Sequence, residues 1–175
     1  MNLIDLLKLE PSRSNIDQII NIVTSNPELF DTLWDIYLQN KDPESRRAAW
    51  AIDLLNEQGY QFKRFDLNEI INLLPSLKHQ GMKRHSLRII FSKEIPEDQI
   101  GVLTDICFRW LESPASSVAV KMFAIKILTK VAEKEPTISR ELIEIIEIQL
   151  DESTAGFRSI GLKTIRKLSK GKKAI

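Results

Sequence analysis

A five-residue pattern that recurs four times constrains this 175-residue chain more than any other feature. Each copy reads as a small residue, a large apolar residue, a charged residue, an apolar residue or Thr, and a large apolar residue. The copies begin at Ala51, Ser86, Ala124 and Gly161, at intervals of 35, 38 and 37 residues. A period in this range indicates stacked supersecondary units that bury their apolar faces against one another. We expect the small residue to let its helix approach neighbouring helices closely.

Helical periodicity extends through the rest of the chain. Apolar residues recur at i, i+3, i+4 and i+7, as in Phe30, Leu33, Trp34 and Tyr37, which places them on one face of a helix. No segment alternates with the period of a strand. The spacing and the Pro, Gly and Asp breaks predict ten short helices, near 2–9, 15–25, 27–40, 43–57, 67–78, 80–93, 96–112, 116–134, 137–151 and 154–170. Pro75 is expected to kink or end its helix.

The helices group into pairs within one expected domain, residues 1–175. We call the first helix of each pair the A helix and the second, which carries the five-residue pattern, the B helix. The predicted parts are two N-terminal capping helices (1–25), four helix pairs (26–58, 66–93, 96–134 and 137–170) and a frayed tail (171–175). The predicted fold is therefore all-α, a right-handed α–α superhelix of four to five antiparallel helix pairs.

This alternation at this period resembles the HEAT and armadillo α-solenoids. The segments 45–50, 118–124 and 154–159 also resemble a family of small bacterial HEAT-like proteins. The resemblance implies an outer, convex layer of A helices and an inner, concave layer of B helices. Concave solenoid surfaces are the usual binding surfaces of such proteins.

Charge is divided unequally between the two kinds of helix. The whole chain has a net charge of +1, which argues against a protein that is basic all over. The predicted A helices, counted with Asp66 just before the second of them, nevertheless sum to −10, and the B helices sum to +11. The B-helix face that points away from the core carries a predicted basic ladder, formed by Arg84, Arg88, Lys126, Lys130, Lys163 and Lys167.

Three functions are compatible with this ladder. We expect a non-catalytic interaction or scaffold module that binds an acidic protein segment in a basic concave groove. The alternative is a nucleic-acid-binding HEAT-repeat protein, whose affinity would fall steeply with salt because phosphates would lie on the same ladder. A structural protein whose charged faces are simply solvated is the third reading.

Residues that could carry chemistry are few. The chain has two histidines and one cysteine, and it lacks metal-binding, phosphate-binding and nucleophile motifs. We expect His79 to end a helix, His85 to lie at a core edge and Cys107 to be an inert buried thiol. The sequence therefore implies no enzyme activity, no cofactor and no metal site.

One constellation resembles the HEAT-repeat DNA glycosylases that remove alkylated bases. That family uses a Trp and an Asp one helical turn apart, with an Arg from a following repeat, and Trp50, Asp53 and Arg88 resemble this set. The Trp–Asp spacing is three residues here and four in that family. Trp50 also falls on the predicted core face, which favours a structural tryptophan over a catalytic one.

The expected location is the cytoplasm. The N-terminus lacks the basic and apolar regions of a signal peptide, and no apolar run approaches the ~20 residues that span a bilayer. A single cysteine, Cys107, cannot form an intramolecular disulfide. We expect a monomer that does not bind membranes.

Overall fold

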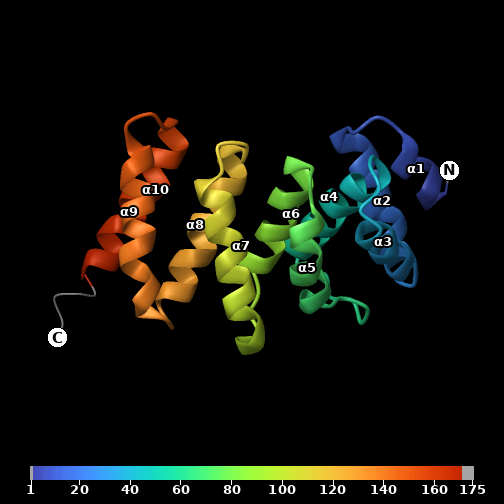
Figure 1. Ribbon diagram of the computed structural model, residues 1–175. Helices are drawn as coiled ribbons and strands as arrows, with labels where there is room; N and C mark the ends of the chain where they lie inside the picture. The colour runs from blue at the N-terminus through green and yellow to red at the C-terminus, as the bar shows by residue number, and fades with distance from the viewer. Residues whose placement is uncertain (1, 171–175) are drawn as a thin grey trace. The chain divides into compact units, whose positions relative to one another are not determined.

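A computed structural model describes residues 2–170, and these residues fold into α-helices and short 3-10 helices with no strand (Figure 1). The all-α prediction is therefore confirmed for the described part of the chain. The predicted frayed tail, 171–175, lies outside the described residues. Within residues 2–170, none of the helices has the length and apolar character that a membrane span requires.

Helix packing divides the chain into two compact units, which we call the N-terminal unit (Met1–Ser92) and the C-terminal unit (Lys93–Ile175). The N-terminal unit contains α1 (Leu3–Lys8), α2 (Arg13–Ser25), α3 (Leu29–Leu38), α4 (Glu44–Glu57), α5 (Leu67–Leu73), a 3-10 helix (Leu74–Ser76) and α6 (Gln80–Phe91). The C-terminal unit contains a 3-10 helix (Glu97–Gln99), α7 (Ile100–Glu112), α8 (Val118–Ala132), a second 3-10 helix (Pro136–Ile138), α9 (Ser139–Leu150) and α10 (Ala155–Lys170).

In the N-terminal unit, α4 is the central helix. It packs against α3 and α6, and the two capping helices α1 and α2 also contact it. The core beside it is aromatic, because Phe30, Trp34 and Tyr37 of α3 are almost completely buried. The indole nitrogen of Trp34 donates a hydrogen bond to Glu69 Oε2 at 2.8 Å. This bond satisfies the one polar group of a side chain that is otherwise fully enclosed.

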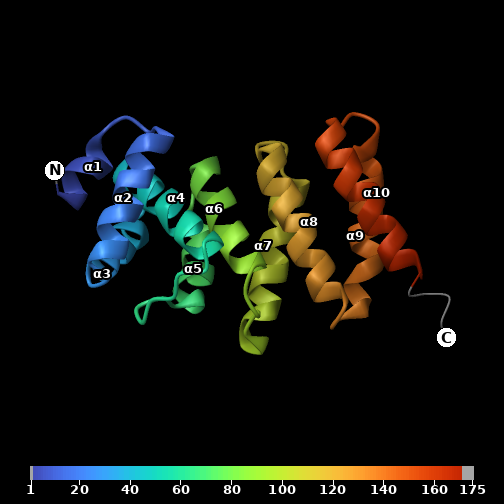
Figure 2. The ribbon, with the colours of Figure 1, turned by 180° about the vertical axis from the view of Figure 1, so that it is seen from behind.

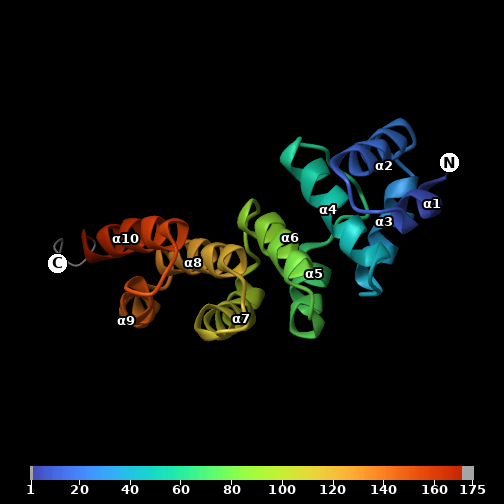
Figure 3. The same cartoon turned by 90° about the horizontal axis from the view of Figure 1, so that it is seen from above.

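In the C-terminal unit, the helices form two layers. The B helices α8 and α10 pack together in one layer, and the A helices α7 and α9 form the second layer beside them (Figures 2 and 3). Buried apolar residues at helical spacing, such as Val120, Ala124, Ile127 and Leu128 of α8, join the layers. The periodicity that predicted these helices is therefore the pattern of core contacts.

The predicted helix boundaries agree with the structure to within a few residues, with informative differences. Helix α5 ends at Leu73, and Pro75 lies in the 3-10 helix that follows, as its missing N–H predicts. His79 begins a helix instead of ending one. Its Nδ1 accepts a hydrogen bond from the Gly81 backbone N–H at 3.0 Å and caps α6. A histidine ring can replace the usual Ser, Asp or Asn at this position, because a neutral ring nitrogen is also an acceptor.

The small residues of the five-residue pattern are all buried, as expected: Ala51, Ser86, Ala124 and Gly161. Gly161 shows how close the helices approach. A Cβ added to it would lie 2.7 Å from Ile146 Cγ2 and 3.3 Å from Leu150 Cδ2 of α9. The small residue therefore permits the contact between α9 and α10.

Successive B helices contact each other within each unit. Asp53 of α4 contacts Arg88 of α6, and their separation of 35 residues equals the repeat interval between these two helices. The charged position of the repeat therefore meets its own counterpart in the N-terminal unit, and we call this pair a rung. In the C-terminal unit Thr129 of α8 contacts Thr164 of α10, a separation two residues shorter than the 37-residue interval between those helices.

Candidate functional site

The predicted basic ladder is divided between the two units. Arg84 and Arg88 lie on α6 of the N-terminal unit, and the four lysines lie on α8 and α10 of the C-terminal unit. The two sets differ in what surrounds each positive charge.

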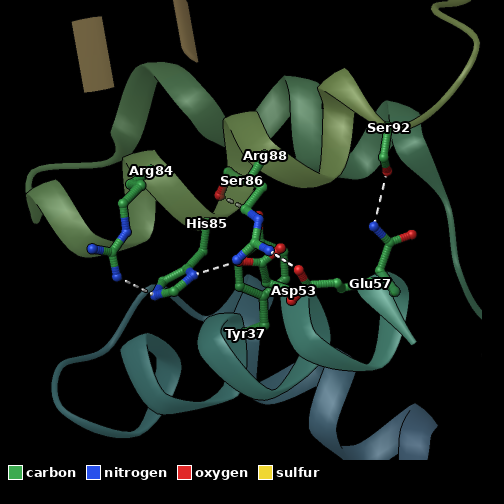
Figure 4. A network of polar contacts seen from close by, with 9 residues as sticks. Tyr37, Asp53, Glu57, Arg84, His85, Ser86, Arg88 and Ser92 are labelled. Atoms are coloured by element: carbon green, nitrogen blue, oxygen red, sulfur yellow. Dashed lines mark hydrogen bonds and ion pairs between the residues drawn. The ribbon is translucent and has the colours of Figure 1, made fainter. Parts of the chain in front are cut away.

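In the N-terminal unit, Arg88 is bound by two carboxylates. Its Nη1 lies 3.3 Å from Asp53 Oδ2, and its Nη2 forms an ion pair with Glu57 (Figure 4). Arg84 directs its Nη2 to Nε2 of His85, at 3.0 Å. The positive charge of Arg88 is therefore neutralised by carboxylates of the preceding B helix, α4. This residue of the predicted ladder is already paired inside the N-terminal unit.

A buried carboxylate organises this network. The Asp53 side chain is 1% exposed, and its Oδ2 accepts a hydrogen bond from His85 Nδ1 at 2.8 Å. An arginine can only donate, so the contact with Arg84 makes Nε2 of His85 the acceptor and Nδ1 the protonated nitrogen. Burial lowers the pKa of His85, and the charges of Arg84 and Arg88 act in the same direction against the opposing effect of Asp53. His85 is therefore neutral at pH 7.

Trp50, Asp53 and Arg88 come together in this network, but not in the manner of a base-excision site. Trp50 is half-buried, not a core residue as predicted, and its ring stacks on His85 with 6.2 Å between centroids and 16° between planes. Asp53 is enclosed by His85 and Arg88, and its Oδ1 is buried without a hydrogen-bond partner among the described residues. A carboxylate covered in this way holds two helices together, and nothing in the geometry supports the glycosylase alternative.

In the C-terminal unit, α8 and α10 carry basic residues and no acidic residue. On α10 the exposed positions 163, 166, 167 and 170 are all Lys or Arg, and their spacing of i, i+3, i+4 and i+7 places them on one face. We call these four residues, together with Lys126 and Lys130 of α8, the basic face. Lys126 Nζ lies 4.6 Å from the centroid of the Phe123 ring, a cation–π contact.

The α10 part of the basic face forms few salt bridges with the described carboxylates. Within residues 2–170, Lys167 pairs with Glu133, whereas Lys163 and Arg166 form no salt bridge with a described carboxylate. Lys130 Nζ donates a hydrogen bond to the backbone oxygen of Lys93. Like charges at i and i+4 on a helix destabilise it by about 0.2–0.5 kcal/mol per pair. The row of four cations on α10 therefore lowers the stability of the helix, so stability does not explain why these residues are all basic.

The remaining reactive groups fit structural roles. Cys107 is fully buried, and burial raises the pKa of its thiol, which agrees with the predicted inert side chain. Among residues 2–170, no group of three or more His, Cys, Asp or Glu side chains is arranged to hold a metal ion.

Two features of the site were missed in the sequence. The pairing of Asp53 with Arg88 removes one rung from the ladder, and the signal for it was the separation of 35 residues, one full repeat. Arg166 and Lys170 belong to the basic face, and their i+3 and i+7 spacing from Lys163 was the signal for them.

Comparison with protein families matches residues 4–168 to the HEAT repeat domain. The match covers almost all of the described chain, including both units. Comparisons with curated proteins and with solved structures returned no match. HEAT repeats typically mediate protein interactions, and their families are generally non-catalytic.

Proposed function

Because the chain belongs to the HEAT repeat domain family, we propose that it is a non-catalytic interaction module whose basic face binds an acidic protein segment. The observation that carries this proposal is the composition of α8 and α10, in which every charged residue is Lys or Arg. The binding residues are Lys126, Lys130, Lys163, Arg166, Lys167 and Lys170. Arg84 and Arg88 of the N-terminal unit are left out, because Arg88 already pairs with Asp53 and Glu57.

Energetics supports a partner over stability as the reason for this face. Exposed ion pairs within a protein contribute about 0–1 kcal/mol each, and repulsion between aligned lysines opposes that small gain. A row of carboxylates on a partner would relieve the repulsion and gain several charge pairs together. Complementary charge of this kind accelerates association and selects partners.

The test is a titration of the full chain with a fluorescein-labelled peptide of glutamates and serines, followed by fluorescence anisotropy at low and high salt. Lys163 and Arg166 are the residues to reverse, since neither forms a salt bridge with a carboxylate among residues 2–170. We expect Lys163→Glu/Arg166→Glu to weaken binding about tenfold or more, because two attractions become repulsions.

The matched control reverses two cations on the A helices. Arg109 of α7 and Arg140 of α9 are 62% and 82% exposed and pair with Asp105 and Glu144 on their own helices, so Arg109→Glu/Arg140→Glu changes the net charge by the same amount without touching the basic face. Binding should then stay close to wild type. Equal losses in both variants would mean that only net charge matters. Binding of duplex DNA with no binding of the acidic peptide would favour the nucleic-acid alternative.

A further inference from the structure

The C-terminal unit also contains a groove that is lined by α7, by the end of α8 and by the segment that leads into α9. It has a volume of about 830 Å³ and runs between α7 and the 3-10 helix that precedes α9. We call it the acidic groove. Its lining residues on α7 include Ile100, Gly101 and Phe108, and the facing residues include Ile138 and Glu141.

The floor of the acidic groove is apolar. Phe108 and Val131 are 8% and 2% exposed, and the half-buried Ile100 and Ile138 flank them. Gly101 leaves the α7 side open, because a Cβ built on it would meet no atom within 4 Å. An apolar side chain placed here would leave water without displacing any residue of the groove.

The rim of the acidic groove carries carboxylates, and the two cations beside them already form salt bridges. Five carboxylates line the groove: Glu97, Asp105, Glu112, Glu135 and Glu141. The cations beside them are Arg109, which pairs with Asp105 at 2.9 Å, and Lys134, which pairs with Glu94 at 2.6 Å. Among the described residues, the four glutamates of the rim form no salt bridge. The rim therefore presents exposed negative charge around an apolar floor.

We propose that the acidic groove binds a basic segment of a partner protein, in which one large apolar side chain is flanked by Lys or Arg. The apolar side chain would lie on Phe108 and Val131, and the flanking cations would face the rim glutamates. The carboxylates come from several elements spread along the groove, which suits an extended segment with several cations better than a single small cation. This inference is independent of the proposed function, because none of its residues belongs to the basic face.

Gly101 gives a test that changes shape without changing charge. Gly101→Phe would place an aromatic ring in the groove, and we expect the fold to be retained because a Cβ at this position meets no atom within 4 Å. Val102→Phe is the matched control: Val102 is the next residue of α7, is 50% exposed and does not line the groove. The probe is a fluorescein-labelled peptide with a central leucine flanked by lysines, titrated against the full chain. Matched peptides replace the leucine with alanine or the lysines with glutamate.

We expect the leucine–lysine peptide to bind, both matched peptides to bind at least tenfold more weakly, and Gly101→Phe to weaken binding by a similar factor. Val102→Phe should bind as the wild type does. Full binding by Gly101→Phe, or equal binding of the leucine and alanine peptides, would overturn the proposal. Self-association that Gly101→Phe abolishes, seen by sedimentation, would assign the groove to a second copy of the chain and also overturn it.

Discussion

The two units use the same repeat position in opposite ways. The third residue of the five-residue pattern is Asp53 in α4 and Arg88 in α6, and the two side chains form a rung inside the N-terminal unit. In the C-terminal unit the same position is Lys126 in α8 and Lys163 in α10. One unit therefore neutralises this position internally, whereas the other leaves two like charges on it. The same repeat position therefore stabilises the fold in the N-terminal unit, and we propose that it binds a partner in the C-terminal unit.

The energetic consequences differ accordingly. Asp53 is buried and depends on His85 and Arg88 for its hydrogen bonds, so each partner matters to the fold. Lys163 is exposed and forms no salt bridge with a described carboxylate, so its removal should leave the fold unaffected. Substitutions at equivalent positions should thus change stability in one unit and binding in the other.

The largest effect is expected from breaking the rung in the N-terminal unit. Asp53→Ala leaves the Nδ1–H of the buried His85 without its acceptor, and we expect the free energy of unfolding to fall by about 2–3 kcal/mol. Urea denaturation followed by circular dichroism measures the change. Hydrogen exchange should locate it in the N-terminal unit.

A surface ion pair of the C-terminal unit provides the control for this substitution. Asp105 is 68% exposed and pairs with Arg109 one turn along α7, so Asp105→Ala should cost less than about 1 kcal/mol. If the two alanine substitutions destabilised the protein equally, Asp53 would be an ordinary surface charge and the contrast between the units would fail.

A smaller effect is expected at the first position of the pattern, which is Ser86 in the N-terminal unit and Gly161 in the C-terminal unit. Ser86 has room for a side chain and hydrogen-bonds with Tyr37 at 2.7 Å. Gly161→Ala would place a Cβ 2.7 Å from Ile146 Cγ2. We expect the resulting overpacking to lower the free energy of unfolding by about 1–2 kcal/mol, measured by urea denaturation.

Gly156, on the same helix α10, is the control for Gly161. A Cβ there would meet Met122 Sδ at 3.6 Å, an ordinary contact distance. Alanine is the better helix former, by up to about 1 kcal/mol, so Gly156→Ala should be neutral or stabilising. A gain in stability from Gly161→Ala would show that α9 and α10 can move apart at no cost, contrary to the close approach inferred from the repeat.

The sequence predicted periodic features better than pairwise ones. The all-α fold, the helix pairs and the buried small residues follow from spacing alone, because burial on one face of a helix imposes a regular pattern. The prediction that Trp50 is a core residue was wrong. A residue at the edge of the apolar face can be buried or can stack on a neighbouring side chain, and Trp50 stacks on His85. Glu97 and Glu141 come together across the acidic groove from segments far apart in the sequence, so no local pattern could indicate that site.

The smallest effect on stability is expected from building the missing rung in the C-terminal unit. Lys126→Asp places an acid at the position of α8 that corresponds to Asp53, and Lys163 is the cation at the position that corresponds to Arg88. The new pair gains about 0–1 kcal/mol, but the contact of Lys126 with the Phe123 ring is lost, which costs a similar amount. The free energy of unfolding should therefore change by less than about 1 kcal/mol, while the acidic peptide binds more weakly. A double-mutant cycle with Lys163→Ala isolates the pair, with Lys126→Asn as the uncharged reference. A favourable coupling energy between Asp at position 126 and Lys163 would confirm that the two positions form a rung, and a coupling of zero would show that the charged positions of α8 and α10 do not meet as those of α4 and α6 do.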